Sequence, residues 1–127
     1  MDALRINRNV DKRFSFLSRI RSFKYAFAGI WALLRTQHNA WIHAVATVFV
    51  IAAGIIMRAS RLEWCAIIFA IAFVWVAEAL NTALEFLADA AHPQFHPLIK
   101  KAKDTAAAAV LIAAFAALLV GVIVFFT

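Results

Sequence analysis

Residues 62–91 read LEWCAIIFAIAFVWVAEALNTALEFLADAA, and this stretch decides the class of fold. As a helix it would be about 45 Å long, more than the roughly 30 Å of a bilayer's hydrocarbon core. No charged residue occurs between Trp64 and Ala77, whereas carboxylates and an amide follow in the last part of the run. We therefore expect a membrane-spanning helix that becomes acidic toward its C-terminal end.

Two further apolar runs, residues 41–57 and 105–126, are also long enough to cross a bilayer. The 127-residue chain is 65% hydrophobic with a mean hydropathy of +0.84, which a soluble domain of this size could not bury. The sequence predicts an all-α integral membrane protein with a single domain, residues 1–127. Its expected parts are a polar tail (1–14), an interfacial amphipathic helix (15–36) and transmembrane helices at 41–57, 62–91 and 105–126.

The segment before the first span has the pattern of a helix that lies in a membrane interface. Its apolar residues recur in steps of four and three, which place them on a single helical stripe. The stripe consists of Phe16, Ile20, Phe23, Phe27, Ile30 and Leu34. Basic residues fall largely off the stripe, as expected for a helix in contact with anionic headgroups.

The basic residues indicate how the chain is oriented. Eight of the thirteen precede the first span, and Lys100, Lys101 and Lys103 lie between the second and third spans. The positive-inside rule then places the N-terminus and this second loop in the cytoplasm. Topology and lipid contact explain the net charge of +6, so we expect no nucleic-acid partner.

The acidic end of the middle span holds the candidate chemistry. Glu78, Asn81, Glu85 and Asp89 fall within an arc of about 80° on one helix face. A carboxylate at mid-membrane costs roughly 2.5–3.5 kcal/mol, so an aligned set requires a compensating partner. A divalent cation or a basic cluster is the usual partner, whereas hydrogen bonding to neighbouring helices is the purely structural alternative.

Lys103 and Asp104 precede the third span on the same expected side of the membrane. Acids for a metal and a lysine for phosphate, next to lipid, indicate phosphoryl transfer, in which catalysis is mostly positioning and charge neutralisation. The only glycines are Gly29, Gly54 and Gly121, so no glycine-rich phosphate loop is present. A nucleotide would have to be held by side chains and Mg²⁺.

Three ordered motifs resemble the prokaryotic diacylglycerol kinase and undecaprenol kinase family. They are the run from Glu78 to Asp89, which is similar to an ExxNxxxExxxD signature, the run that begins Lys103-Asp104, and Ser22 to Gly29 in the surface helix. The resemblance implies a homotrimer in the bacterial inner membrane, with active sites shared between subunits on the cytoplasmic side. It also implies direct transfer of phosphate from Mg·ATP to the hydroxyl of a membrane lipid.

The resemblance assigns a role to each matching position. Glu78 matches the general base, which would accept the lipid proton, and Asn81 matches an orienting amide. Glu85 matches a metal-binding carboxylate at the nucleotide. The remaining expected nucleotide contacts are Tyr25, Lys103 and Asp104, together with Gln94 and His96 in a loop near the nucleotide.

One position departs from the pattern. Where the family carries a second metal-binding glutamate, this chain has Gln37. The Gln37 amide can still offer an oxygen to Mg²⁺ and the nucleotide, but it adds no negative charge, so metal affinity should be weaker. We interpret the site as working with one carboxylate and phosphate oxygens; altered activity is the alternative.

Other interpretations of the same residues remain open. The acids could form a proton or ion relay in a conducting subunit, or Gln37 could mark a decayed site in a non-catalytic protein. The lipid could be undecaprenol or diacylglycerol; the Pro93 and Pro97 loop modestly favours undecaprenol. The four histidines (His38, His43, His92 and His96) have no metal-ligand spacing and are taken as ordinary polar residues.

Overall fold

The structure is a computed structural model in which residues 16–127 are described. This part of the chain contains four helices and no strand. The predicted polar tail, residues 1–14, lies outside the described residues. Two units are distinguished, and their described parts are residues 16–31 and residues 32–127. Each unit is described by itself.

Helix α1 (Phe16–Thr36) is continuous over the segment predicted to be amphipathic. Hydroxyl side chains within it form hydrogen bonds to backbone carbonyls one turn earlier. The Ser22 hydroxyl donates to the Ser18 carbonyl at 3.0 Å. Thr36 does the same with Ala32 at 2.7 Å. Such local bonds let serine and threonine remain helical in apolar surroundings.

Gln37 separates α1 from α2 (His38–Ile56). Its backbone is extended, at φ −109° and ψ 116°, so one residue is enough to end one helix and begin the next. The indole N–H of Trp41 donates to the Leu34 carbonyl at 2.9 Å and satisfies one of the acceptors left at the end of α1. The Gln37 side chain does not cap α2, so its amide has no structural duty there.

A tight turn connects α2 to α3 (Arg61–Ala91). Arg58 has a positive φ of 55°, and Ser60 caps α3 by accepting a bond from the Glu63 backbone N–H at 3.2 Å. Gly54 makes the close approach of the two helices possible. A Cβ at Gly54 would lie 2.8 Å from the Trp64 ring, so a larger residue would require that ring to move.

Helix α4 (Pro97–Phe126) begins eight residues before the predicted span at 105–126. The loop expected between the spans at 62–91 and 105–126 therefore ends at His96. The physical reason is local, because the His96 ring accepts the Leu98 N–H at 3.1 Å and Pro97 occupies the first helical position. The polar residues up to Asp104 consequently extend the helix instead of forming a loop.

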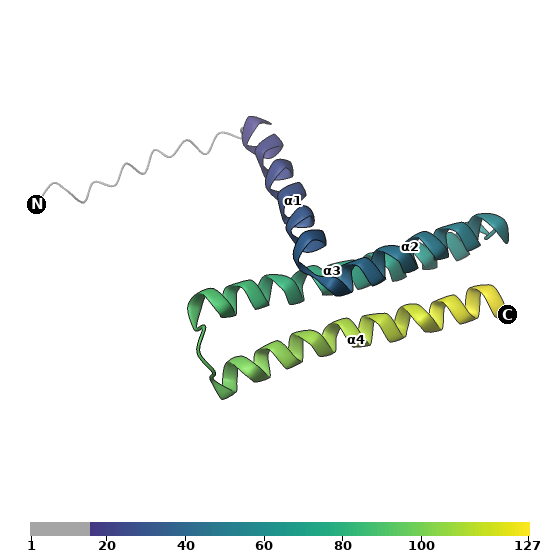
Figure 1. Ribbon diagram of the computed structural model, residues 1–127. Coiled ribbons are helices and arrows are strands. Elements are labelled where there is room, and N and C mark those ends of the chain that lie inside the picture. The colour runs from purple at the N-terminus through teal and green to yellow at the C-terminus, as the bar shows by residue number, and fades with distance from the viewer. Residues whose placement is uncertain (1–15) are drawn as a thin grey trace, which may run out of the picture. The chain divides into compact units, whose positions relative to one another are not determined.

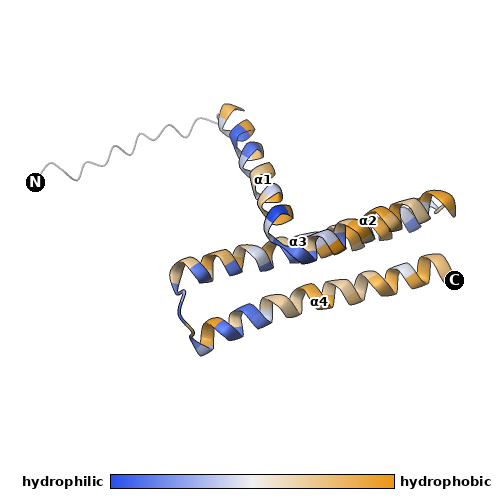
Figure 2. Cartoon of the chain, in the orientation of Figure 1, coloured by the Kyte–Doolittle hydropathy of each residue, from blue (hydrophilic) through white to orange (hydrophobic). Residues whose placement is uncertain are grey.

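Helices α3 and α4 form an antiparallel hairpin, and α2 packs against α3 (Figure 1). Three helices are long and apolar enough to cross a membrane: α2, α3 and α4. Polar residues concentrate where the α3–α4 loop joins the two helices, whereas the remainder of α4 is apolar (Figure 2). The predicted all-helical fold with three spanning helices is confirmed.

Candidate active site

Glu78 is almost completely buried, with 1% of its surface exposed. Within residues 16–127, neither of its carboxylate oxygens has a hydrogen-bond partner, and the same holds for the Asn81 side-chain oxygen and the Thr82 hydroxyl. Burying a charge without a partner is costly, so buried polar groups are normally satisfied. This concentration of unsatisfied groups on one stretch of α3 makes it the candidate active site.

Glu78 and Asn81 open onto a small cavity of about 290 Å³ between three helices. Asn39, Ile42 and His43 line it from α2, and Glu78 and Asn81 line it from α3. Helix α4 contributes only apolar walls, namely Ala107, Val110, Leu111 and Ala114. The predicted base and the predicted orienting amide thus share one cavity, which we call the carboxylate pocket.

The His43 imidazole lies beside the Glu78 carboxylate. Its Nε2 atom lies 3.4 Å from Oε2 of Glu78. The distance is within ion-pair range, although the pair does not form a hydrogen bond of good geometry.

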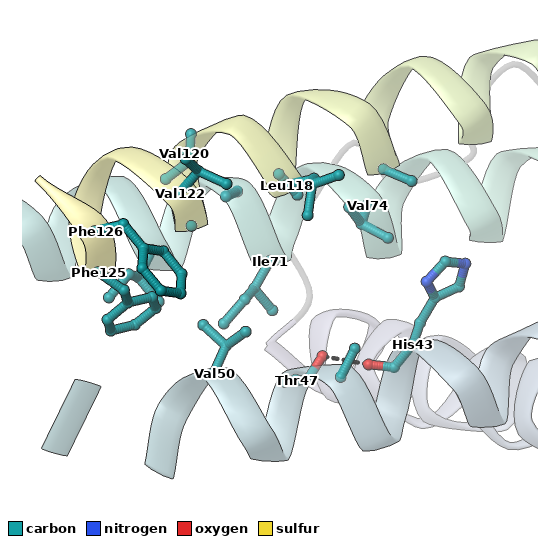
Figure 3. A pocket seen from close by; sticks show the side chains of 16 residues that line it. His43, Thr47, Val50, Ile71, Val74, Leu118, Val120, Val122, Phe125 and Phe126 are labelled. Carbon is teal, nitrogen blue, oxygen red and sulfur yellow. Dashed lines mark hydrogen bonds between the residues drawn. The ribbon is translucent and has the colours of Figure 1, made fainter. Parts of the chain in front are cut away.

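A second cavity, of about 340 Å³, is lined by residues of α2, α3 and α4 (Figure 3). His43 and Ala114 line both cavities. Its walls are otherwise almost entirely apolar and extend to Phe125 and Phe126 at the end of α4. We call it the apolar cavity; the buried carboxylate lies at the end marked by His43.

The predicted phosphate-binding residues lie at the loop end of α3 and α4 and are engaged in ion pairs. The Lys103 ammonium lies 2.6 Å from the Asp89 carboxylate, and the Lys100 ammonium lies 2.5 Å from Asp104. Both pairs are largely exposed, and such pairs contribute only about 0–1 kcal/mol. A nucleotide phosphate could therefore displace either carboxylate at little cost.

The other predicted site residues are more dispersed. Glu85 is half-buried on α3, about 10 Å along the helix from Glu78, and does not line the carboxylate pocket. Gln94 and His96 are exposed in the loop, where the Gln94 carbonyl lies 2.9 Å from the His92 ring. Tyr25 belongs to the first unit. The structure therefore places Glu78 and Asn81 in one pocket, which neither Glu85 nor Lys103 lines.

A complete metal site is not formed by the described part of one chain: within residues 16–127, no three His, Cys, Asp or Glu side chains are grouped to hold an ion. Mg²⁺ in nucleotide enzymes typically uses only one or two carboxylates and takes its other ligands from phosphate and water. Glu85 fits that requirement, since it is half-buried and makes no hydrogen bond or ion pair within the described residues. Gln37, whose amide does not cap α2, could supply a second oxygen.

Comparison with known proteins adds independent information. Residues 24–125 match the prokaryotic diacylglycerol kinase family. The chain belongs to this family. The matched segment contains every predicted site residue, from Tyr25 to Asp104.

Individual members of the prokaryotic diacylglycerol kinase family are also similar over most of the chain. An undecaprenol kinase of Bacillus subtilis is 38% identical over 105 residues, which cover 83% of this chain and 85% of the relative. A diacylglycerol kinase of Synechocystis is 42% identical over 79% of this chain, but the match covers only 58% of that longer protein. A diacylglycerol kinase of Helicobacter pylori is 34% identical over 101 residues. The expected family and the expected class of enzyme, a lipid kinase, are confirmed.

Two residues in or near the carboxylate pocket, His43 and Thr82, were not predicted from the sequence as site residues. His43 was taken as an ordinary polar residue, although with Thr47 it forms an i, i+4 polar pair in an otherwise apolar span. That spacing was an available signal for an inward-facing pair. Thr82 is buried one turn after Glu78, and nothing in the local sequence distinguished it from a helix-satisfied threonine.

Proposed function

We propose that the protein transfers the γ-phosphate of ATP directly to the hydroxyl of a membrane lipid alcohol, undecaprenol or diacylglycerol. One observation supports the proposal above the others: the buried Glu78 carboxylate, which accepts no hydrogen bond within residues 16–127, lines a pocket that shares His43 and Ala114 with an apolar cavity. That arrangement suits a molecule with a hydroxyl head and a hydrocarbon chain. The names of the relatives support the two candidate alcohols.

In the proposed reaction, Glu78 accepts the proton of the lipid hydroxyl as the oxygen attacks the γ-phosphorus. The bond between the γ-phosphorus and the leaving ADP oxygen breaks as the new oxygen–phosphorus bond forms. Asn81 orients the hydroxyl through its buried amide oxygen. Lys103 neutralises phosphate charge after exchanging its Asp89 partner for the nucleotide.

Mg²⁺ bound with ATP would neutralise charge on the phosphates, with Glu85 and Gln37 as its protein ligands. Asp104, Tyr25, Gln94 and His96 are the remaining proposed nucleotide contacts. We place the site on the cytoplasmic side of the bacterial inner membrane, which the lysines at the loop end of the hairpin support.

A homotrimer with shared sites is part of the proposal. The carboxylate pocket of one chain contains the base but neither Glu85 nor Lys103, so the neighbouring subunit is a reasonable source of the phosphate-binding groups. Most of the large apolar side chains of α4 are exposed in the single chain, including Leu111, Phe115 and Leu118. These faces are available to a neighbouring subunit or to lipid.

A direct assay tests the proposed function. Purified protein in mixed micelles receives γ-labelled ATP, Mg²⁺ and either undecaprenol or diacylglycerol. We expect label in the lipid fraction with at least one alcohol, and none after chelation of Mg²⁺. The ratio of the two rates identifies the preferred substrate. If neither lipid is labelled, the proposed activity is wrong.

Changing Gln37 to glutamate should lower the Mg²⁺ concentration for half-maximal rate by roughly three- to tenfold, because a carboxylate binds the ion more strongly than an amide. The Gln37 side chain does not cap α2, so the substitution should not disturb the helix start. Titration of Mg²⁺ at saturating ATP measures the effect, with Gln37→Asn as a neutral control. An unchanged Mg²⁺ requirement would place Gln37 outside the metal shell.

Filling the apolar cavity should weaken lipid binding. Ala117 lines it, so Ala117→Phe is expected to raise the KM for the lipid by about tenfold or more, while the KM for ATP stays constant. Ala116 is exposed on the same helix and does not line the cavity, which makes Ala116→Phe a matched control. Equal KM values for the two variants would indicate that the lipid chain lies elsewhere.

A further inference from the structure

His43 is the only side chain within residues 16–127 that lies within ion-pair distance of the buried Glu78 carboxylate, at 3.4 Å from Oε2. The imidazole is itself mostly buried, with 17% of its side chain exposed. The distance is slightly longer than a typical hydrogen bond of 2.7–3.2 Å. Such bonds are often long in ligand-free enzymes and shorten when substrate is bound. A small movement of either side chain would complete this one.

Two other residues, Thr47 and Trp75, contact His43. The Trp75 indole N–H donates to the Thr47 hydroxyl at 3.0 Å, and that hydroxyl donates to the His43 carbonyl at 2.6 Å. The Trp75 and His43 rings also meet edge to face, with their centroids 6.4 Å apart. These contacts join α3 to α2 at the level of the imidazole. The Trp75 ring is therefore the direct contact of the imidazole in this group, and the two hydrogen bonds fix the backbone of His43 relative to Trp75.

No other charged side chain lines the carboxylate pocket in the described part of the chain. Helix α4 presents only alanine, valine and leucine to it, and the other polar groups, Asn39 and Asn81, are neutral amides. Within residues 16–127 neither carboxylate oxygen accepts a hydrogen bond, so a single donor to one of them would have a large influence on the orientation of the group. His43 is the side chain placed to act as that donor.

We propose that His43 is a positioning residue for lipid phosphorylation: its Nε2–H holds Oε2 of Glu78, which leaves Oε1 directed at the lipid hydroxyl. The inference rests on the proposed function and deepens it. Each oxygen of the carboxylate then has one task. The hydroxyl proton moves to Oε1, the lipid oxygen bonds to phosphorus, and ADP leaves; Glu78 later loses the proton to water. The imidazole exchanges no proton and remains a donor throughout.

If His43 acts as a hydrogen-bond donor, a side chain of similar size should replace it only if it also carries an N–H. Two substitutions test this requirement. His43→Leu keeps apolar volume but removes the N–H, and we expect kcat to fall by roughly 10- to 100-fold with the KM for lipid and ATP unchanged. His43→Gln retains an N–H at about the same distance from the backbone and should recover most of the loss. His38→Leu, an exposed histidine on the same helix that lines neither cavity, is the matched control.

The following outcomes support or overturn a positioning role for His43. Recovery in His43→Gln, together with no additional loss when His43→Leu is combined with Glu78→Gln, supports the proposal. Equal losses in the leucine and glutamine variants, or a change in KM alone, would overturn it. Trp75→Phe covers the case in which His43→Leu does not fold. It removes the indole that contacts the His43 ring, and kcat should fall by a few-fold without a change in KM. Activity of the unchanged protein in the same assay distinguishes failure of this inference from failure of the proposed function.

Discussion

Replacement of Glu78 by glutamine is expected to reduce phosphate transfer to lipid by at least about 100-fold, the lower end of what a general base contributes. Glutamine fills the same space in the carboxylate pocket but cannot accept the hydroxyl proton. The same substitution should leave the melting temperature unchanged or raise it, because it removes a buried carboxylate without a hydrogen-bond partner within the described residues. Steady-state kinetics and a thermal melt of the same preparation measure both effects.

The matched control for this prediction is Glu63→Gln. Glu63 lies on the same helix, in the first turn of α3, roughly 22 Å from Glu78 along the axis. We expect activity within about twofold of the unchanged protein, since Glu63 lines neither cavity. A Glu78→Gln variant that is active but less stable would show that the carboxylate has a structural role and not a catalytic one.

Glu85→Gln should also reduce activity by at least about 100-fold at ordinary Mg²⁺ concentrations, but for another reason. The variant removes the only carboxylate in the proposed protein ligand set, because Gln37 supplies an amide. The charge stabilisation that a metal provides is several kcal/mol, and each 1.36 kcal/mol is a factor of ten in rate. Raised Mg²⁺ should restore part of the activity of Glu85→Gln and none of that of Glu78→Gln. Loss that is independent of Mg²⁺ would contradict a metal-binding role.

The two variants together also examine whether the sites are shared. If the base and the metal ligand come from different subunits, mixed trimers contain some sites with both residues intact. With random assembly from equal amounts, about a quarter of the sites should be complete. Co-reconstituted Glu78→Gln and Glu85→Gln should then recover a corresponding part of the activity. Mixtures as inactive as either variant alone would indicate that each chain uses its own pair.

Much of the architecture was accessible from the sequence. The three spanning helices follow from the length of the apolar runs, because a bilayer core requires about twenty apolar residues of helix. The shared face of Glu78, Asn81 and Glu85 follows from helical periodicity alone. The start of α4 was placed too late, since the charged residues before Thr105 were taken as loop. His96 caps the N-terminus of α4 and Pro97 occupies its first position, so the helix begins there and includes the charged residues that follow.

The different environments of Glu78 and Glu85 could not be predicted in the same way. Both occupy the same face of one helix, yet Glu78 is 1% exposed and Glu85 is half-buried outside the carboxylate pocket. What distinguishes Glu78 from Glu85 is the part of α4 that packs against α3 at the level of each residue. The small and apolar residues from Ala107 to Ala114 of α4 cover the level of Glu78, and that coverage depends on how two distant segments pack.

The sequence by itself determined the spanning helices and the acidic face, because helix length and periodicity are local properties of consecutive residues. It also limited the phosphate-binding groups to side chains, since there is no glycine-rich loop. Only the tertiary structure decided that His43 meets Glu78, that Lys103 pairs with Asp89, and that an apolar cavity shares His43 and Ala114 with the carboxylate pocket. Those features join residues from separate helices, so they depend on the register in which α2, α3 and α4 pack.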